Sequence, residues 1–372
     1  MTARKRFDVT FYSPWIGGLL RPGSASASGG AETQILALAR GLVRRGHSVC
    51  MVVRDTEDGL PASFDGIEIR AIASPKGRGV WKLWWGLHVA TALARSRSSA
   101  MVQSAAGVET LIVGAISRLY GRRFVYRSAN VVDFDFGRLD RNRLRVAAYH
   151  LGIRLAQVLV VQTSEQVSLA RQRFRRQPVL IKSVAETAAG PPGKSREAFL
   201  WIGRLAAYKR PDELLALAAA LPRMPFRVVA VPGELDEASL RAEAGRLPNV
   251  EWLGPRARTE LLELIGSAVA VVNTAEYEGM PNIFLEGWAR GVPALSLHHD
   301  PDGVIESEGI GLFAAGDRER LAAQAASLWS EEEGARASLA RRCVDYVERE
   351  HGLDRALDGW EMALGLPSRS RL

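Results

Sequence analysis

The chain has 372 residues, 47% of them hydrophobic and 24% charged, with a mean hydropathy of −0.04. This length exceeds one usual hydrophobic core and predicts two domains. No apolar run approaches the roughly 18–20 residues that span a bilayer, and the first residues lead into a short strand instead of a secretory signal. We therefore expect a globular, cytoplasmic protein and exclude a transmembrane one.

Charge is unevenly distributed along the chain, whose formal net charge is +8. Residues 1–190 hold 28 Lys and Arg and 13 Asp and Glu, a net charge of +15, whereas the remainder carries −7. A basic first half suits an anionic partner, such as a membrane leaflet, a lipid-linked phosphate acceptor or nucleic acid. The alternative is that the arginines are simply solvated. The two cysteines, Cys50 and Cys343, lie far apart without metal-ligand spacing, which fits a reducing cytosol.

The first half of the chain has the alternating pattern of a parallel α/β sheet. A strand, a helix and a second strand between residues 7 and 53 make one βαβ unit, which predicts parallel strands. Gly29 and Gly30 stand at the start of that helix, where backbone N–H groups can face a phosphate, although the pattern is not G-x-G-x-x-G. The expected strands are 7–12, 48–53, 101–103, 124–127, 156–161 and 179–181, and the expected helices are 31–45, 81–95, 138–154 and one capped by 163–165.

The helix expected at 81–95 is rich in tryptophan. Leu83, Leu87, Ala90 and Leu93 follow helical spacing and form a core stripe, so packing against the sheet is the favoured interpretation. An exposed, weakly basic aromatic surface is the alternative.

The second half begins after a linker. Residues 188–197 are small, rich in Gly and Pro and without periodicity, which is typical of a connection between domains. The strands expected beyond it are 199–202, 226–231, 250–253 and 268–272, and the expected helices include 321–329, 337–348 and 354–364.

A basic loop follows the first strand of this half. It contains Gly203, Arg204 and, five residues further on, Lys209. Two such side chains are suited to a phosphate, because fixed cations aimed at developing negative charge stabilise a transition state. The alternative is a basic surface turn.

A strand–loop–helix unit is predicted at residues 276–293, after the strand at 268–272. Pro281 suits the first helical position because its missing N–H has no intrahelical partner there. Such a helix start attracts phosphate or other anions. Glu278 stands before the helix and Glu286 inside it. Two carboxylates at such a place are suited to sugar hydroxyls and not to the phosphate.

Together these motifs resemble those of family 4 retaining glycosyltransferases of the GT-B fold, also described as glycosyl transferases group 1. Glu278 and Glu286 resemble the family's E-x7-E motif, and the loop from Gly203 to Lys209 resembles its G-R-L-x3-K motif. The unit that contains Gly29 and Gly30 resembles the family's opening unit, whose glycine loop lies beside the donor phosphates and the acceptor.

The resemblance implies roles for these residues. Arg204 and Lys209 would hold the donor diphosphate, Glu278 would orient the transferred sugar, and Glu286 would grip the nucleotide ribose. On this division, loss of Glu286 weakens binding of bare nucleotide and donor alike, whereas loss of Glu278 leaves the affinity for bare nucleotide near normal. The residues expected to bind substrate without a catalytic role are Gly29, Gly30, Gly203, Gly279, Met280, Pro281, Asn282 and Glu286.

The resemblance also implies an α/β GT-B fold with two Rossmann-like, parallel-sheet domains facing a central cleft. The N-terminal, acceptor-side domain would span 1–187, the linker 188–197 and the nucleotide-sugar donor domain 198–348. The C-terminal helix, within 349–372, would cross back to the N-terminal domain.

The implied function is retaining transfer of a hexose-type sugar from a nucleotide diphosphate sugar to a glycan or lipid-linked acceptor. Bacterial exopolysaccharide, lipopolysaccharide or related surface glycan synthesis is the expected context. We expect peripheral contact with the anionic inner face of the cell membrane, no nucleic acid partner and no cofactor. A non-catalytic nucleotide-sugar-binding protein and a GT-B sugar-nucleotide epimerase are the alternatives. The base, sugar, acceptor, linkage and oligomeric state stay open.

Two departures from a simple site accompany this interpretation. Many family members carry a histidine near the end of the strand that precedes Ser128, and none stands here, so Ser128, Asn130 or Asp133 is expected to take its place. His298 and its neighbours 299–302 are read as an exposed loop and not as a metal ligand set, because a histidine pair beside aspartates needs a suitable geometry. No metal site is therefore expected.

Overall fold

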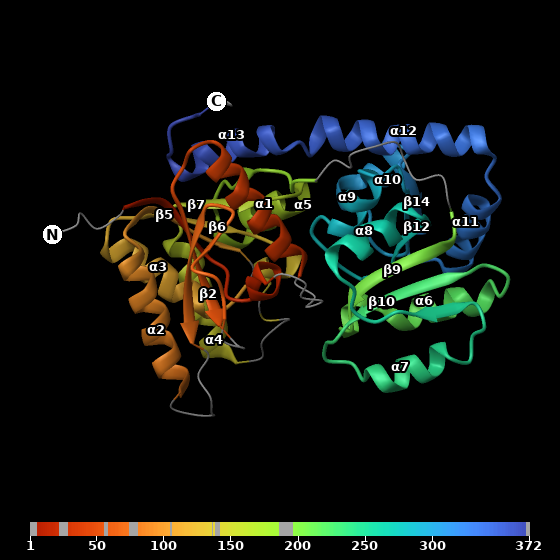
Figure 1. Ribbon diagram of the computed structural model, residues 1–372, viewed down its shortest axis with the longest axis horizontal. Coiled ribbons are helices and arrows are strands. Elements are labelled where there is room, and N and C mark those ends of the chain that lie inside the picture. The colour runs from red at the N-terminus through yellow and green to blue at the C-terminus, as the bar shows by residue number, and fades with distance from the viewer. Residues whose placement is uncertain are drawn as a thin grey trace. The chain divides into compact units, whose positions relative to one another are not determined.

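The computed structural model describes residues 6–21, 29–55, 59–73, 81–104, 106–135, 137, 142–185 and 196–369, and only the backbone of 81–83. Most of the linker expected at 188–197 lies outside these residues, as does the start of the helix expected at 138–154. The chain divides into two compact units. The first holds the residues up to Val184 and those from Leu353 onward, and the second holds Ala185–Gly352 (Figure 1).

In the first unit the described strands form one sheet in the order β3-β4-β2-β1-β5-β6-β7-β8, parallel except where β3 meets β4. The central strands are apolar runs buried on both faces, as expected when helices cover both sides of a parallel sheet. The β3–β4 hairpin was not predicted. The strands are β1 (Phe7–Tyr12), β2 (Val49–Asp55), β3 (Ser63–Phe64), β4 (Ile67–Ala73), β5 (Ser98–Ser104), β6 (Arg123–Arg127), β7 (Val158–Val161) and β8 (Val179–Leu180).

The two faces of this sheet carry different helices. Successive strand residues point to opposite faces, so Val125 of β6 joins the core under α1 and α13, whereas Phe124 joins the core under α2, α3 and α4. Trp360 fills the first of these cores and Tyr149 the second. The helices of the unit are α1 (Gly30–Arg44), α2 (Trp81–Ser96), α3 (Glu109–Leu119), α4 (Arg143–Leu155), α5 (Ser164–Phe174) and α13 (Leu353–Leu364), with short 3-10 turns η1 (Ile16–Leu20) and η2 (Val131–Phe134).

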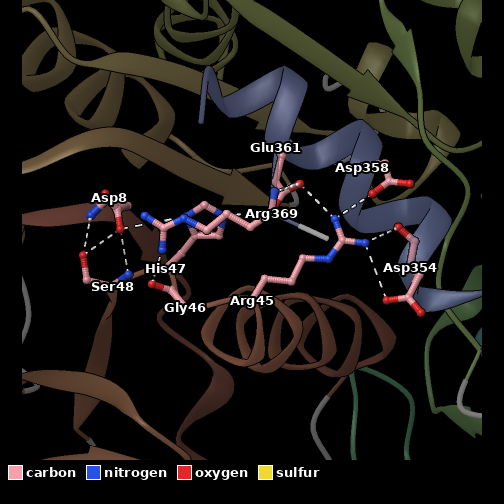
Figure 2. Close-up of polar contacts among 9 residues, drawn as sticks. All are labelled: Asp8, Arg45, Gly46, His47, Ser48, Asp354, Asp358, Glu361 and Arg369. Atoms are coloured by element: carbon pink, nitrogen blue, oxygen red, sulfur yellow. Dashed lines mark hydrogen bonds and ion pairs between the residues drawn. The ribbon is translucent and has the colours of Figure 1, made fainter. Parts of the chain in front are cut away.

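A buried ionic cluster fixes α13 to the first unit (Figure 2). Arg45, at the end of α1, donates from Nη1 to Asp358 Oδ1 at 2.6 Å and to Glu361 Oε2 at 2.8 Å. His47 Nε2 lies 2.8 Å from Glu361 Oε1. Arg45 is 6% exposed and Glu361 only 1%. Since removal of one partner would leave a buried charge uncompensated, this cluster specifies where the C-terminal helix packs.

In the second unit the described strands form one fully parallel sheet in the order β11-β10-β9-β12-β13-β14. Trp201 of β9 and Trp288 of α9 are among the largest fully buried side chains of its core. The strands are β9 (Ala198–Arg204), β10 (Phe226–Val231), β11 (Val250–Trp252), β12 (Ala268–Asn273), β13 (Ala294–Ser296) and β14 (Gly311–Phe313). The helices are α6 (Pro211–Ala220), α7 (Glu237–Ala244), α8 (Arg258–Gly266), α9 (Asn282–Trp288), α10 (Val304–Ser307), α11 (Arg318–Ser330) and α12 (Glu333–Glu350), with 3-10 turns η4 (Ala207–Lys209) and η5 (Pro301–Gly303).

Two parallel-sheet α/β units confirm the predicted fold class, and three local predictions were wrong. Pro281 is the N-cap of α9 and not its first helical residue. Leu87 belongs to no core, since it is 60% exposed on α2. In the loop expected to be exposed, His298 to Asp300 are half-buried and Pro301 is buried, whereas Asp302 is exposed as predicted. Within the described residues, no helix combines the length and apolar character needed to cross a bilayer.

Candidate functional site

The two predicted motifs meet because their strands are neighbours. β9 and β12 pair in parallel, so the loops that follow them leave from the same edge of the sheet. The strand order also reverses here, with β10 and β11 on one side of β9 and β12 to β14 on the other. In open parallel sheets, ligands bind at the carboxyl ends of the strands beside such a reversal.

Hydrogen bonds join the two loops directly. The Glu276 N–H donates to the Tyr208 carbonyl at 2.9 Å, and Thr274 Oγ1 donates to the Lys209 carbonyl at 2.7 Å. The rings of Tyr208 and Tyr277 stack with centroids 4.8 Å apart. Residues far apart in the sequence therefore form one rigid surface, which is the condition for a preorganised site.

Lys209 forms an ion pair with Glu278, which the sequence did not predict. The two side chains are 20% and 11% exposed. Burial is the largest single influence and opposes the charged ammonium, but the charge and hydrogen bond of Glu278, together with Tyr208, raise the pKa of Lys209. Lys209 is thus a fixed cation whose present partner is the first carboxylate of the acidic motif.

Glu286 also has a cationic partner. Its Oε1 accepts a hydrogen bond of 2.6 Å from Nη1 of Arg258, the first residue of α8. The two side chains are 15% and 32% exposed. Sequence reasoning missed Arg258, because the contact joins two helices across 28 positions and no local pattern marks it.

Arg204 ends β9 and is exposed. No carboxylate of the described part of the chain lies within ion-pair distance of it. Gly203 has a packing reason to be glycine, since a Cβ there would lie 2.8 Å from the Trp201 ring. Gly233, after β10, approaches the same loop so closely that a Cβ would lie 2.2 Å from the Leu205 carbonyl oxygen. The loop that carries Arg204 therefore has fixed neighbours on both sides.

Arg210 follows Lys209 at the end of this loop and ties it to neighbouring carboxylates. It has a positive φ of 48°, which an arginine rarely adopts. Its guanidinium donates to Asp212, to the almost fully buried Glu213 at 2.6 Å and to Glu276 at 3.0 Å. These contacts, especially the hydrogen bond to Asp212, raise the pKa of Arg210. No role was predicted for Arg210, and its contacts make it a support for the neighbouring Lys209.

The loop that follows Glu278 contacts His299 through its backbone. His299 Nε2 lies 2.9 Å from the Gly279 carbonyl oxygen. Gly279, Met280 and Pro281 are buried, and Asn282 opens α9, which has only 7 residues. In the described residues no group of three or more His, Cys, Asp and Glu is arranged to hold a metal ion.

The remaining predicted residues lie in the first unit. Gly29 is the N-cap of α1 and Gly30 its first residue. Ser128 and Asp133 are buried and bind the backbone around η2, for example through a 2.6 Å hydrogen bond from the Ala129 N–H to Asp133 Oδ2. Burial raises the pKa of Asp133 to about 6. Of the three residues named in place of the family's histidine, Asn130 is the half-buried one.

Two family descriptions match the sequence. Residues 29–183 match the "Glycosyl transferase 4-like domain" and residues 196–331 match "Glycosyl transferases group 1". Together they cover more than half of the chain and include both motifs of the site. No curated protein sequence matches significantly.

Solved structures with a similar fold are distant in sequence. Sucrose-phosphate synthase from Thermosynechococcus elongatus is 16% identical, with a TM-score of 0.77 over 96% of this chain and 98% of that one. Anabaena HepE in complex with UDP and glucose is 16% identical, with a TM-score of 0.74 over 97% and 100%. The lipopolysaccharide outer core galactosyltransferase WaaB is 16% identical, with a TM-score of 0.62 over 96% and 99%. At such identities the likeness shows the fold, which is GT-B.

Proposed function

The chain belongs to the group 1 glycosyltransferases of the GT-B fold, and we propose that it transfers a hexose-type sugar from a nucleotide diphosphate donor with retention of anomeric configuration. One observation carries the proposal. The cationic loop after β9 and the acidic loop after β12 meet at the carboxyl edge of one sheet, where Lys209 and Glu278 form an ion pair. Anabaena HepE, which shares the fold, binds UDP and glucose, which supports a nucleotide-sugar donor here.

The cations suit the leaving group. When the bond between the anomeric carbon and the β-phosphate oxygen breaks, its electron pair remains on the diphosphate. Arg204, which is exposed, and Lys209, which is fixed by its loop, would stabilise that charge. The acceptor hydroxyl forms the new bond to the anomeric carbon on the same face, and its proton passes to the departing phosphate oxygen. No side-chain nucleophile is required by this route.

The carboxylates suit the hydroxyls of the donor. Glu286 would accept hydrogen bonds from the ribose, and Glu278 would accept them from the transferred sugar, beside the backbone of 279–282. An ionised carboxylate accepts such bonds more strongly than a neutral group. Arg258 and Lys209 hold the two carboxylates in a defined orientation before a donor binds.

The acceptor is proposed to be a glycan or a lipid-linked glycan of a bacterial surface polysaccharide, met at the inner face of the cell membrane. The net charge of +15 in residues 1–190 supports an anionic membrane as the partner. WaaB, which shares the fold, is a lipopolysaccharide outer core galactosyltransferase, and this supports the proposed context.

The test has two stages. Thermal unfolding against a panel of nucleotide sugars identifies the donor, since a ligand bound to the folded state raises the melting temperature. Transfer to glycan and lipid-linked acceptors is then followed by release of nucleoside diphosphate, and the anomeric configuration of the product is read by NMR. An inverted product would refute retention, and a protein stabilised by no nucleotide sugar would refute the donor.

Variants connect the activity with the site. Arg204→Ala and Lys209→Ala should each lower kcat/KM by about ten- to hundredfold, because each removes a charge-assisted contact worth roughly 1.5–3 kcal/mol. Arg227→Ala is the matched control, because Arg227 lies near the start of β10, at the opposite edge of the same sheet, and pairs with Glu197 and Glu251. Near-normal transfer by both site variants would remove these residues from the mechanism.

A further inference from the structure

A histidine from a neighbouring loop contacts the loop that follows Glu278. His299 lies after β13, which pairs in parallel with β12, so its loop leaves from the same edge of the sheet as the acidic loop. The Nε2 atom of His299 lies 2.9 Å from the carbonyl oxygen of Gly279. Because a carbonyl oxygen only accepts hydrogen bonds, Nε2 carries the proton and His299 is the donor. Protonation of the other ring nitrogen would leave this bond in place.

Contacts within its own loop aim the His299 ring. The hydroxyl of Ser296, which is fully buried, donates to the His299 carbonyl oxygen at 2.5 Å. The next residue, Asp300, accepts hydrogen bonds from the N–H groups of Ile305 at 2.9 Å and Glu306 at 3.3 Å. The backbone is therefore fixed before and after the ring, so the ring has a defined direction of its own when it meets the acidic loop.

The hydrogen bond from His299 sets the direction of one peptide group in the acidic loop. The C=O and the N–H of a trans peptide point in opposite directions, and none of the described peptide bonds is cis. With the Gly279 carbonyl turned toward His299, the Met280 N–H points away from that ring. Within the described part of the chain, neither this N–H nor the Gly279 N–H has a hydrogen-bond partner.

These two N–H groups need an acceptor that the described residues do not supply. Gly279 and Met280 are buried, and Met280 is only 7% exposed. Buried backbone N–H groups are almost always paired, because an unpaired one costs free energy. On the proposed function the nearest acceptor is the transferred sugar, since Glu278 stands two residues earlier. A sugar hydroxyl both accepts and donates, so one hydroxyl can accept from the Met280 N–H and donate to the Glu278 carboxylate.

We propose that His299 is a positioning residue for the donor sugar. Its hydrogen bond holds the peptide between Gly279 and Met280 so that the Met280 N–H meets a hydroxyl of the sugar beside Glu278. The inference rests on the proposed function and deepens it, because it names a residue outside both motifs that orients the sugar-binding loop. It also predicts that His299 matters for the complete donor and not for the nucleotide product, which has no sugar to meet this N–H.

The first experiment compares two ligands on the full chain. They are the nucleotide sugar that most raises the melting temperature of the parent protein and the nucleoside diphosphate that it contains. His299→Leu should lower the affinity for the nucleotide sugar, and kcat/KM through a higher KM, by about three- to tenfold, because one neutral hydrogen bond is lost. The affinity for the nucleoside diphosphate in calorimetric titration should not change. His299→Gln should keep most of the affinity for the nucleotide sugar, since its amide N–H can reach the same carbonyl oxygen.

His298→Leu is the matched control. It removes the neighbouring histidine, whose Nε2 has no hydrogen-bond partner among the described residues, and should leave both affinities near those of the parent. Ser296→Ala is a second route to the same contact, because it frees the backbone of His299, and it reports on that contact even if His299→Leu does not fold. It should lower the affinity for the nucleotide sugar by a smaller factor than His299→Leu. In the double variant it should add little, since changes that act through one contact are not additive.

Hydrogen exchange of the protein without ligand tests the loop independently of catalysis. The N–H groups of Phe284 and Leu285 both bond to the carbonyl of Pro281, which follows the positioned peptide. They should exchange about three- to tenfold faster in His299→Leu and at the parent rate in His298→Leu, because protection follows the local free energy of opening. His299→Gln should again resemble the parent.

The proposal is overturned if His299→Leu binds the nucleotide sugar as tightly as the parent, or if it loses affinity for both ligands equally. Either result leaves the proposed activity intact, because the parent still transfers sugar. It is also overturned if the losses in Ser296→Ala and His299→Leu add fully, since the two side chains would then act separately. A parent protein that transfers no sugar, yet shows faster exchange in His299→Leu, would instead refute the proposed function and with it the sugar as the ligand of this loop.

Discussion

The ion pair between Lys209 and Glu278 makes the first carboxylate of the acidic motif an electrostatic competitor of the donor diphosphate. The change considered is Glu278→Gln, which keeps the size of the side chain and removes its charge. The Lys209 ammonium bonds to Glu278. A diphosphate that recruits Lys209 must share it with this carboxylate, and the two anions then repel each other.

The magnitude follows from that contact. Hydrogen bonds to charged groups contribute roughly 1.5–3 kcal/mol, and every 1.4 kcal/mol is about tenfold in affinity. Release of Lys209 should therefore strengthen binding of bare nucleoside diphosphate by about tenfold in Glu278→Gln. Transfer of sugar should fall by about ten- to hundredfold, because the sugar loses its charged acceptor. From the sequence alone, the affinity for bare nucleotide was expected to stay near normal.

Calorimetric titration with the nucleoside diphosphate, alongside a transfer assay, measures both effects. Glu276→Gln is the control. It removes the same charge two positions away from Glu278, and the Glu276 carboxylate pairs with Arg210 and not with Lys209. The reasoning fails if bare nucleotide binds Glu278→Gln no more tightly than the parent protein. It also fails if Glu276→Gln gains as much, because the effect would then be general electrostatics.

The remaining predictions concern a second ion pair, a metal, a buried acid and the C-terminal helix. Glu286→Ala should lower the affinity for bare nucleotide and for the donor by about tenfold or more in calorimetric titrations. Arg258→Ala should cause part of the same loss, because Glu286 is then no longer oriented. Sugar transfer should persist in the presence of a chelator, because Arg204 and Lys209 stabilise the charge on the diphosphate. Since the folded-state pKa of Asp133 is raised to about 6, the free energy of unfolding should fall as pH rises from about 4 to about 6, and Asp133→Asn should reduce that slope in denaturant titrations. Glu361→Gln should destabilise the fold by about 1.5–3 kcal/mol, seen as a lower midpoint of denaturation, because it removes the charge from the buried acceptor that Arg45 and His47 share.

Each of these has an outcome that contradicts it. Unchanged nucleotide affinity in Glu286→Ala would mean that the ribose binds to other residues. Loss of activity in chelator that magnesium restores would mean that the reaction needs a metal ion. An unaltered pH slope in Asp133→Asn, with Asp135→Asn as the neighbouring control, would remove Asp133 as its source. A variant Glu361→Gln as stable as the parent would mean that apolar contacts such as those of Trp360 hold α13 in place.

The fold was predictable from the sequence because its signals are local. The strand at 7–12 coincides with β1, and Thr163 caps α5 by accepting from the Gln166 N–H, as its position before the helix indicated. α3 was missed. Its residues, 109–119, have clear apolar spacing and lie between two strands that were predicted, so a helix could have been expected there. Leu87 was assigned to the core because spacing identifies an apolar face but cannot tell whether protein or solvent covers it.

The site was predictable only in its linear motifs. Spacing along the chain placed Arg204 and Lys209 in one loop, Glu278 in a second loop and Glu286 in the helix that follows it, and the pairing of β9 with β12 brings the two loops together. The contacts of Lys209 with Glu278 and of Arg258 with Glu286 could not be predicted, because each joins side chains through the tertiary arrangement and has no sequence pattern. These contacts change what the motifs imply about binding.

On the proposed assignment, both carboxylates of the acidic motif are neutralised before a donor arrives, and Arg204 is left to attract the diphosphate. A complete donor can exchange every bond it breaks, since its phosphates take Lys209 while its sugar and ribose hydroxyls take Glu278 and Glu286. A bare nucleotide lacks the sugar, so it can release Lys209 only by leaving Glu278 unpaired and mostly buried. Because such a charge costs free energy, the same ion pair that orients Glu278 for the sugar should favour the donor over the nucleotide product and hasten departure of that product after transfer.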